Sequence, residues 1–260
     1  MATAFYEPLG DDRYRSTEHT VGPWGPDSQH AGPPSALLAR ALEQMPASWP
    51  GTLTRISIDI LGAVPVAELT VRTRTLRPGR NVELVEAEAE AGGRTVLRAQ
   101  GWRMRAGEVE LPAVPAGGPV DPVPEFSTED KPFFDWGGGY LKAMQWRFVP
   151  GTQRGVGKAA VWGRMRFPLV GDEEPTGLQR VLTLADAGSG VSYRLSPQDW
   201  LFINTELTVH LAAPPTGEWI CMAGTTRLDP SGFGLASTRL FDRNRLVGLG
   251  AQSLYVAARS

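Results

Sequence analysis

The sequence has little of what disulfide-held or metal-held folds need. Only one of its 260 residues is cysteine, Cys221, and three are histidine. One cysteine excludes an intramolecular disulfide framework and a cysteine-based zinc cluster, and we expect it to be a small buried apolar residue in the strand-like segment EWICMAG. The histidines, His19, His30 and His210, are scattered and show no metal-ligand spacing. We therefore expect no metal and no cofactor.

An excess of positive charge and a long apolar run are also missing. Lys and Arg number 26 against 28 Asp and Glu, for a formal charge of −2, which gives no electrostatic case for a nucleic-acid binder. No run approaches the ~18 uncharged apolar residues of a spanning helix. The opening MATAFYEPLGDDRYRS lacks the apolar segment of a signal peptide. We expect a cytoplasmic protein with no membrane span and no nucleic-acid partner.

Several catalytic motifs are absent. There is no G-x-S-x-G, so a nucleophile elbow is not indicated, and there is no dinucleotide fingerprint. The segment GTQRGVGKAA resembles a phosphate loop but has Thr152 where the motif needs glycine and Ala159 where it needs Ser or Thr. The sequence therefore gives no case for a serine-elbow hydrolase, a P-loop nucleotidase or a dinucleotide enzyme.

Prolines divide the chain near its middle. Residues 107–133, GEVELPAVPAGGPVDPVPEFSTEDKPF, contain six prolines and little periodicity, as a linker does. We predict two domains, 1–106 and 134–260, joined by the linker 107–133.

Each predicted domain has one helix and an antiparallel meander. Leu38, Leu42 and Met45 have helical spacing, while Ile56 and Ile58 alternate as in a strand. The predicted helices are about 35–45 and 175–187. The predicted strands are 53–61, 68–76, 82–91, 95–105, 141–149, 159–167, 202–211, 218–228, 234–242 and 245–258.

The two domains resemble each other in the order of their elements. When Thr54 is aligned with Thr205, the apolar residues that follow them in their own strands coincide. Farther along, Ala99-Gln100 aligns with Ala251-Gln252 after the offset between the halves has changed by one residue. A long helix followed by a meander, twice, indicates an α+β protein. We predict a double hotdog, in which two antiparallel sheets are each wrapped around a central helix and related by an internal pseudo-two-fold axis.

Three polar residues adjoin segments that are otherwise apolar. Asp186 lies at the edge of the apolar stripe of the second helix. Thr205 and Gln252 share strand faces with apolar neighbours, and a buried glutamine needs a hydrogen-bond partner. Each also has an ordinary alternative: a solvated aspartate, a strand threonine and a structural glutamine. Together they can position one water molecule, with the aspartate as general base.

These residues also carry a resemblance to a known family. The segments LADAGSG, INTELTVHLAAPPTGEWI and GLGAQSLYV resemble, in that order, the C-terminal half of type II acyl-CoA thioesterases and their actinobacterial relatives. The segment from QHAGPPSALLARALE to LRAQGWRMR resembles their N-terminal hotdog. In that family an Asp, a Ser or Thr and a Gln orient the hydrolytic water, which implies catalytic roles for Asp186, Thr205 and Gln252. The strand can also be aligned with Ile203 in the place of Thr205, and Asn204 is adjacent.

The resemblance implies an enzyme of lipid metabolism that hydrolyses acyl-CoA to a free acid and CoA. Asp186 would deprotonate water, and backbone N–H groups at a helix start would stabilise the oxyanion. His30 and Gly32, before the first helix, are expected to line the substrate pocket, although His30 can equally be an ordinary loop residue. Pro33 and Pro34 lack N–H groups, so this helix start offers few donors.

Two other functions stay open. Hotdog folds host several functions, so a non-catalytic module that binds acyl thioesters or lipid is the main alternative. The other is dehydration of a hydroxyacyl thioester, which usually pairs an aspartate with a histidine on the central helix. The segment from Val181 to Gly190 contains no histidine, which disfavours it. Because hotdog sheets often associate, we also expect a homodimer or a higher homo-oligomer.

Overall fold

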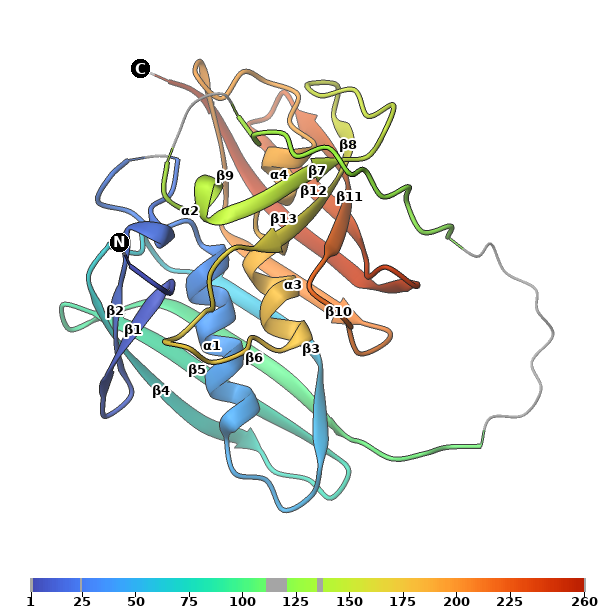
Figure 1. Cartoon of the computed structure of the whole chain (residues 1–260). Helices are drawn as coiled ribbons and strands as arrows, with labels where there is room; N and C mark the ends of the chain where they lie inside the picture. Colours follow the sequence, from blue (N-terminus) through green and yellow to red (C-terminus); the bar gives the residue numbers. More distant parts are fainter. Residues whose placement is uncertain (1, 24, 111–120, 135–137, 260) are drawn as a thin grey trace.

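We describe a computed structural model of the chain, covering residues 2–23, 25–110, 121–134 and 138–259 (Figure 1). We call the described residues up to 110 the N-terminal half and those from 121 onward the C-terminal half. Residues 111–120 of the predicted linker lie outside the described residues.

The N-terminal half contains one long helix and a meander, as predicted, at residues 32–44 and 51–105. Two short strands and a 3-10 turn, which the sequence did not indicate, come before them. The elements are β1 (Tyr6–Gly10), β2 (Arg13–Ser16), η1 (Glu18–Thr20), α1 (Gly32–Gln44), β3 (Gly51–Ile60), β4 (Glu68–Arg77), β5 (Val82–Ala91) and β6 (Arg94–Arg105).

The C-terminal half repeats this order with three interruptions. Residues 141–149, predicted as one strand, begin as a helical turn. The second helix stops at Ala185 and resumes for one turn, and the strand 202–211 breaks at Thr205. The elements are α2 (Tyr140–Ala143), β7 (Met144–Phe148), β8 (Lys158–Met165), α3 (Gly177–Ala185), α4 (Gly188–Val191), β9 (Trp200–Asn204), β10 (Glu206–Leu211), β11 (Ile220–Asp229), β12 (Phe233–Phe241) and β13 (Leu246–Ala258).

The described strands form one open antiparallel sheet in the order β1-β2-β4-β5-β6-β3-β10-β13-β12-β11-β8-β7, with β9 also paired to β13. This corrects the prediction of two separate sheets, because β3 of the N-terminal half pairs with β10 of the C-terminal half. Unpaired strand edges expose N–H and C=O groups. Pairing the two edges satisfies these groups and fuses the halves.

The register between β3 and β10 locates the internal symmetry. Ser57 lies opposite Thr208, and these two residues are 151 apart, the same offset that aligns Thr54 with Thr205. The pseudo-two-fold axis therefore passes between Ser57 and Thr208. Their hydroxyl oxygens lie 3.1 Å apart and share a hydrogen bond.

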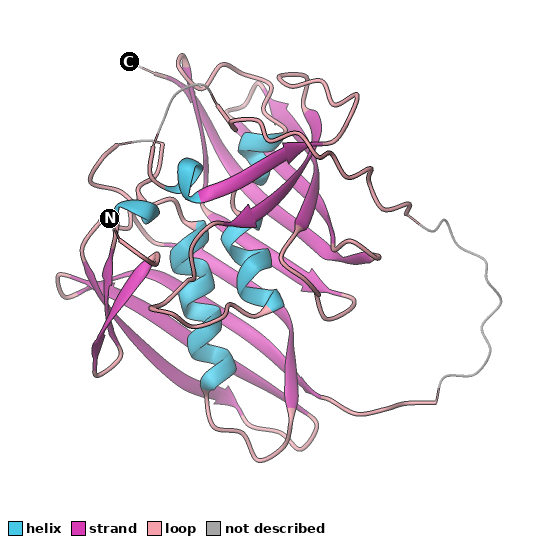
Figure 2. Ribbon diagram, viewed as in Figure 1, coloured by secondary structure: helices cyan, strands magenta, loops and turns pink. Residues whose placement is uncertain are grey.

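Helices α1 and α3 lie side by side between the two parts of the sheet (Figures 1 and 2). α1 packs on β3 to β6, and α3 packs on β8, β10, β11 and β12. The two helices run antiparallel, since Gly32 at the start of α1 adjoins Thr183 near the end of α3, and Glu43 at the end of α1 bonds Gln179 near the start of α3. The start of α1 and the end of α3 therefore meet between the halves.

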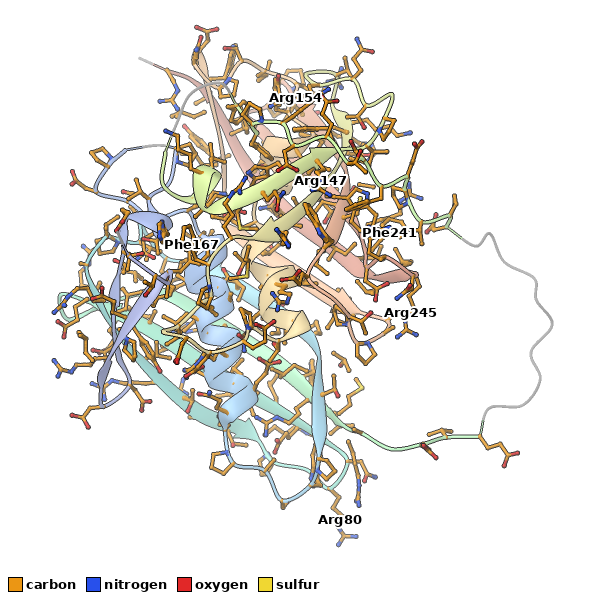
Figure 3. All side chains as sticks on the ribbon, in the orientation of Figure 1. Arg80, Arg147, Arg154, Phe167, Phe241 and Arg245 are labelled. Atoms are coloured by element: carbon orange, nitrogen blue, oxygen red, sulfur yellow. The ribbon has the colours of Figure 1, made fainter. Side chains whose placement is uncertain are left out.

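The described end of the predicted linker packs on the C-terminal half. The guanidinium of Arg147, labelled in Figure 3, lies over the rings of Phe126 and Trp219, at 5.2 and 4.4 Å from their centroids. Phe126 also packs on the small cluster of Trp162 and Phe241. These cation–π and apolar contacts tie the segment around Phe126 to the strands of the C-terminal half.

Candidate active site

Asp186 occupies the point where the second helix is interrupted. It is the C-cap of α3, with φ −64° and ψ −23°, and α4 starts two residues later at Gly188. Its side chain contacts His30, just before the start of α1, and the residue is only 6% exposed. A carboxylate this deeply buried requires polar partners, and the site is built from them.

Two carboxamides hold one carboxylate oxygen. Asn204 Nδ2 donates to Asp186 Oδ1 at 2.7 Å, and Gln252 Nε2 reaches the same atom at 3.4 Å and the Asp186 carbonyl at 3.0 Å. Gln252 is fixed in turn, because its Oε1 accepts the N–H of Ser189 at 3.1 Å. At Gly188 an added Cβ would come within 3.0 Å of Gln252 Oε1, so glycine allows this close approach.

The other carboxylate oxygen faces a histidine from the N-terminal half. His30 Nδ1 lies 3.1 Å from Asp186 Oδ2, and the imidazole stacks on Tyr140 at 3.8 Å between ring centroids. The Tyr140 hydroxyl donates to the Thr183 carbonyl at 2.9 Å, which fixes the stack. Burial lowers the pKa of His30 and the Asp186 charge opposes this, so the imidazole is neutral at pH 7.

Gly32 lies behind His30 and is not on the cavity wall. Its N–H points at His30 Nδ1 at 3.1 Å, and an added Cβ would fall 2.2 Å from the Thr183 carbonyl oxygen. Glycine is therefore needed where the two helices meet. Pro33 and Pro34 have no N–H and the Ser35 N–H bonds Ala31, so Gly32 carries the one N–H of this helical turn that points toward the site.

Thr205 does not take the predicted position. Asn204 pairs with Leu254 of β13 and Thr208 pairs with Ala251, so four steps along β9–β10 match three along β13. The extra residue makes a β-bulge. Because of the bulge, the side chain that points toward the interior is that of Asn204 and not that of Thr205. Thr205 is exposed, and among the described contacts no hydrogen bond joins its side chain to Asp186.

A cavity of about 390 Å³ opens beside these groups. Its polar wall carries Asp186, His30 and Asn204, with Thr205 at the bulge. Most of the remaining wall is apolar, as ligand cavities usually are. The larger apolar side chains of the lining are Ile60, Val64, Phe133, Phe134, Leu141, Phe202 and Ile203.

Two family models match the chain, one in each half. The model of the acyl-CoA thioesterase N-terminal domain matches residues 20–104, and that of the acyl-CoA thioesterase C-terminal domain matches residues 117–256. The chain belongs to the acyl-CoA thioesterase family. It is accordingly a thioester hydrolase. No curated protein sequence matches the chain.

Solved structures show the fold. A hotdog-fold protein of unknown function from Alicyclobacillus acidocaldarius is 12% identical with a TM-score of 0.71, covering 97% of this chain and 96% of its own. A TesB protein of Mycobacterium avium subspecies paratuberculosis is 14% identical with a TM-score of 0.68 and the same coverage. The acyl-CoA thioesterase II TesB2 of Mycobacterium marinum is 17% identical with a TM-score of 0.62, covering 98% and 96%. The fold of this family member is thus a hotdog fold.

The described residues show neither a metal cluster nor a membrane-spanning helix. Within the described ranges, no cluster of three His, Cys, Asp or Glu side chains is placed to hold a metal ion. In the same part of the chain, no helix is long and apolar enough to cross a membrane.

Proposed function

We propose that this family member hydrolyses fatty acyl-CoA to the free acid and CoA, using a water molecule activated by Asp186. One observation carries the proposal: a single buried carboxylate lies in an otherwise largely apolar cavity and is held there by Asn204, Gln252 and His30. Burying an ion without use is costly. A carboxylate that activates water, directly or through a neighbouring base, would account for that cost.

The cavity suits an acyl thioester. Its apolar wall can take the acyl chain while the thioester carbonyl lies near Asp186, the position from which a bound water can attack. Asn204 and Gln252 would keep the carboxylate fixed through the reaction, so that little reorganisation opposes the transition state.

The test measures hydrolysis of a panel of acyl-CoAs of increasing chain length, with the release of free thiol as the readout. We expect turnover by the wild type and a loss of 10²-fold or more in kcat for Asp186→Asn. Asp172→Asn is a matched control at an exposed aspartate and should hydrolyse normally. Full activity in Asp186→Asn would refute the assignment.

The same experiment decides between the alternatives. A non-catalytic binding module would bind acyl-CoA and release no thiol. Dehydration was disfavoured for lack of a histidine near Asp186, but the structure supplies His30 from the other half. Incubation with a 3-hydroxyacyl-CoA and analysis for the enoyl thioester therefore belongs in the panel. We expect thiol release and no enoyl product.

We also propose that the chain consists of two hotdog domains, 1–106 and 134–260, with 107–133 as their linker. Two features support this division. The elements repeat in order across it, and β3 meets β10 about a pseudo-two-fold axis. The active site would then combine His30 of the first domain with Asp186 of the second.

A further inference from the structure

The Asp186 carboxylate already has three protein groups against it. Oδ1 faces Asn204 Nδ2 at 2.7 Å and Gln252 Nε2 at 3.4 Å, and Oδ2 faces His30 Nδ1 at 3.1 Å. Both carboxylate oxygens are therefore already engaged by protein groups. Asp186 is thus better arranged to orient a neighbour than to take a proton from water directly.

His30 offers a second proton acceptor in the same cavity. The residue lines the cavity wall, and its Nε2 atom has no hydrogen bond to the described residues. Nε2 is also absent from the fully buried polar atoms that lack a partner. This nitrogen is therefore open to the cavity, where the attacking water would lie.

The contacts of Nδ1 fix the tautomer. Nδ1 lies 3.1 Å from both Asp186 Oδ2 and the Gly32 N–H, and it cannot donate to one and accept from the other at once. A lone pair directed at a carboxylate would be repelled, whereas a charge-assisted hydrogen bond is the stronger of the two options. Nδ1 therefore carries the proton and Nε2 presents its lone pair; in this tautomer the Gly32 N–H makes no hydrogen bond to Nδ1.

We propose that His30 Nε2, with Nδ1–H held by Asp186, is the atom that takes the proton from the attacking water. This inference rests on the proposed function and refines how Asp186 activates the water. A buried carboxylate on Nδ1 holds the imidazole in the required tautomer and stabilises the imidazolium as it forms.

The reaction balances with these groups alone. The water oxygen bonds the thioester carbon as one of its protons moves to Nε2, which gives a tetrahedral oxyanion and an imidazolium. When the oxyanion collapses, the C–S bond breaks with its electron pair on sulfur. Nε2 then returns the proton to the thiolate. The products are a carboxylic acid and a thiol, and His30 is neutral again.

Two substitutions separate catalysis from positioning. In His30→Asn the side-chain amide can take the place of Nδ1 and still donate to Asp186, but there is no base in the place of Nε2. We expect kcat with acyl-CoA to fall about 10²-fold with little change in KM. His30→Gln removes the Asp186 contact and should lose at least as much activity.

His19 provides the matched control. It also stacks on an aromatic ring, that of Phe167 (labelled in Figure 3), at 3.9 Å between centroids, and it does not line the cavity. His19→Gln should leave kcat within twofold of the wild type. Circular dichroism and thermal unfolding verify that all three variants are folded before their kinetics are compared.

The pH dependence of kcat distinguishes a catalytic base from a structural residue, because a purely structural role of His30 would not change it. Among the described residues, the titratable groups against the His30 ring are Asp186 and Tyr140. Burial raises the pKa of Tyr140, so its hydroxyl stays neutral. Protonating Nε2 removes the base, so kcat should fall with decreasing pH through the pKa of His30, which burial places below the ordinary value of about 6.5.

Two measurements complete the test. The acid limb of the wild type should vanish from the residual activity of His30→Asn, and nitrogen NMR of the resting enzyme should show His30 protonated at Nδ1. A His30→Asn enzyme with wild-type kcat, an unchanged acid limb, or a proton found on Nε2 would each overturn the proposal. A wild type that hydrolyses no thioester would instead overturn the proposed function, so the two failures are distinguishable.

Discussion

Asn204 Nδ2 lies 2.7 Å from Asp186 Oδ1, the position in which the sequence placed the hydroxyl of Thr205. A carboxamide there donates an N–H to the carboxylate, as a threonine hydroxyl would donate its O–H. Either residue type can donate a hydrogen bond to the Asp186 carboxylate. The one-residue bulge places Asn204, and not Thr205, in the position to do so.

The first prediction contrasts these two neighbours. Asn204→Ala removes a hydrogen bond to a buried charge, a loss of about 1.5–3 kcal/mol, and should lower kcat roughly ten- to hundredfold. Thr205→Ala should stay within about twofold in kcat. Steady-state kinetics with one acyl-CoA measures both. Equal losses in the two variants would contradict the assignment of Asn204.

The second prediction concerns Gly188. A Cβ there would lie 2.9 Å from Thr238 Cγ2 and 3.0 Å from Gln252 Oε1, so Gly188→Ala must displace Gln252 from the Ser189 N–H. We expect a loss of about 1–3 kcal/mol in unfolding free energy and a fall in kcat of about tenfold. Urea unfolding and kinetics test this, with Gly107→Ala as the control, since nothing lies within 4 Å of its added Cβ.

The third prediction concerns a pair that joins the halves. Arg40 donates to both oxygens of Glu173, each at 2.7 Å, and this contact lowers the pKa of Glu173. A lowered folded-state pKa adds stability above the unfolded value of about 4.3 and loses it as pH falls through the folded one. The Glu173 side chain is 51% exposed, so the effect is small.

Glu173→Gln should therefore lose about 0.2–1 kcal/mol of unfolding free energy near pH 7. The difference from the wild type should shrink as pH falls below about 4. Urea titrations of both proteins across that range provide the comparison. If the difference in unfolding free energy between the two proteins stays constant or grows on acidification, the charge of Glu173 does not cause it.

The fourth prediction concerns Cys221. It is fully buried, and burial raises the pKa of its thiol far above the ordinary value, so almost no thiolate forms. We expect iodoacetamide to leave the folded enzyme unlabelled and to add one group in denaturant, as mass spectrometry would show. Labelling of the folded enzyme at neutral pH would contradict the buried position.

Much of the fold was predictable because its strands alternate and its turns contain glycine and proline. Leu207 and Val209 are buried as alternation requires. Alternation assumes an unbroken two-residue period, however, so it could not show the bulge that brings Asn204 to Asp186. The joined sheet was also missed, because single-strand patterns do not specify which edges pair.

Asp186 and Gln252 could be chosen from sequence because a polar residue beside an apolar face needs a partner, and each is the other's partner. His30 could be placed near the pocket but not beside Asp186, since 156 residues separate them and no local pattern spans that distance. The cytoplasmic location and the homo-oligomer stay predictions.

The seam between β3 and β10 has a consequence for how the enzyme behaves on dilution. Hotdog proteins whose halves are separate chains would lose a shared site when the chains dissociate, so their activity would depend on protein concentration. Here one continuous chain and one continuous sheet hold His30 and Asp186 together. Because the tether fixes a high effective concentration of each half for the other, the site should persist in a single molecule at any dilution.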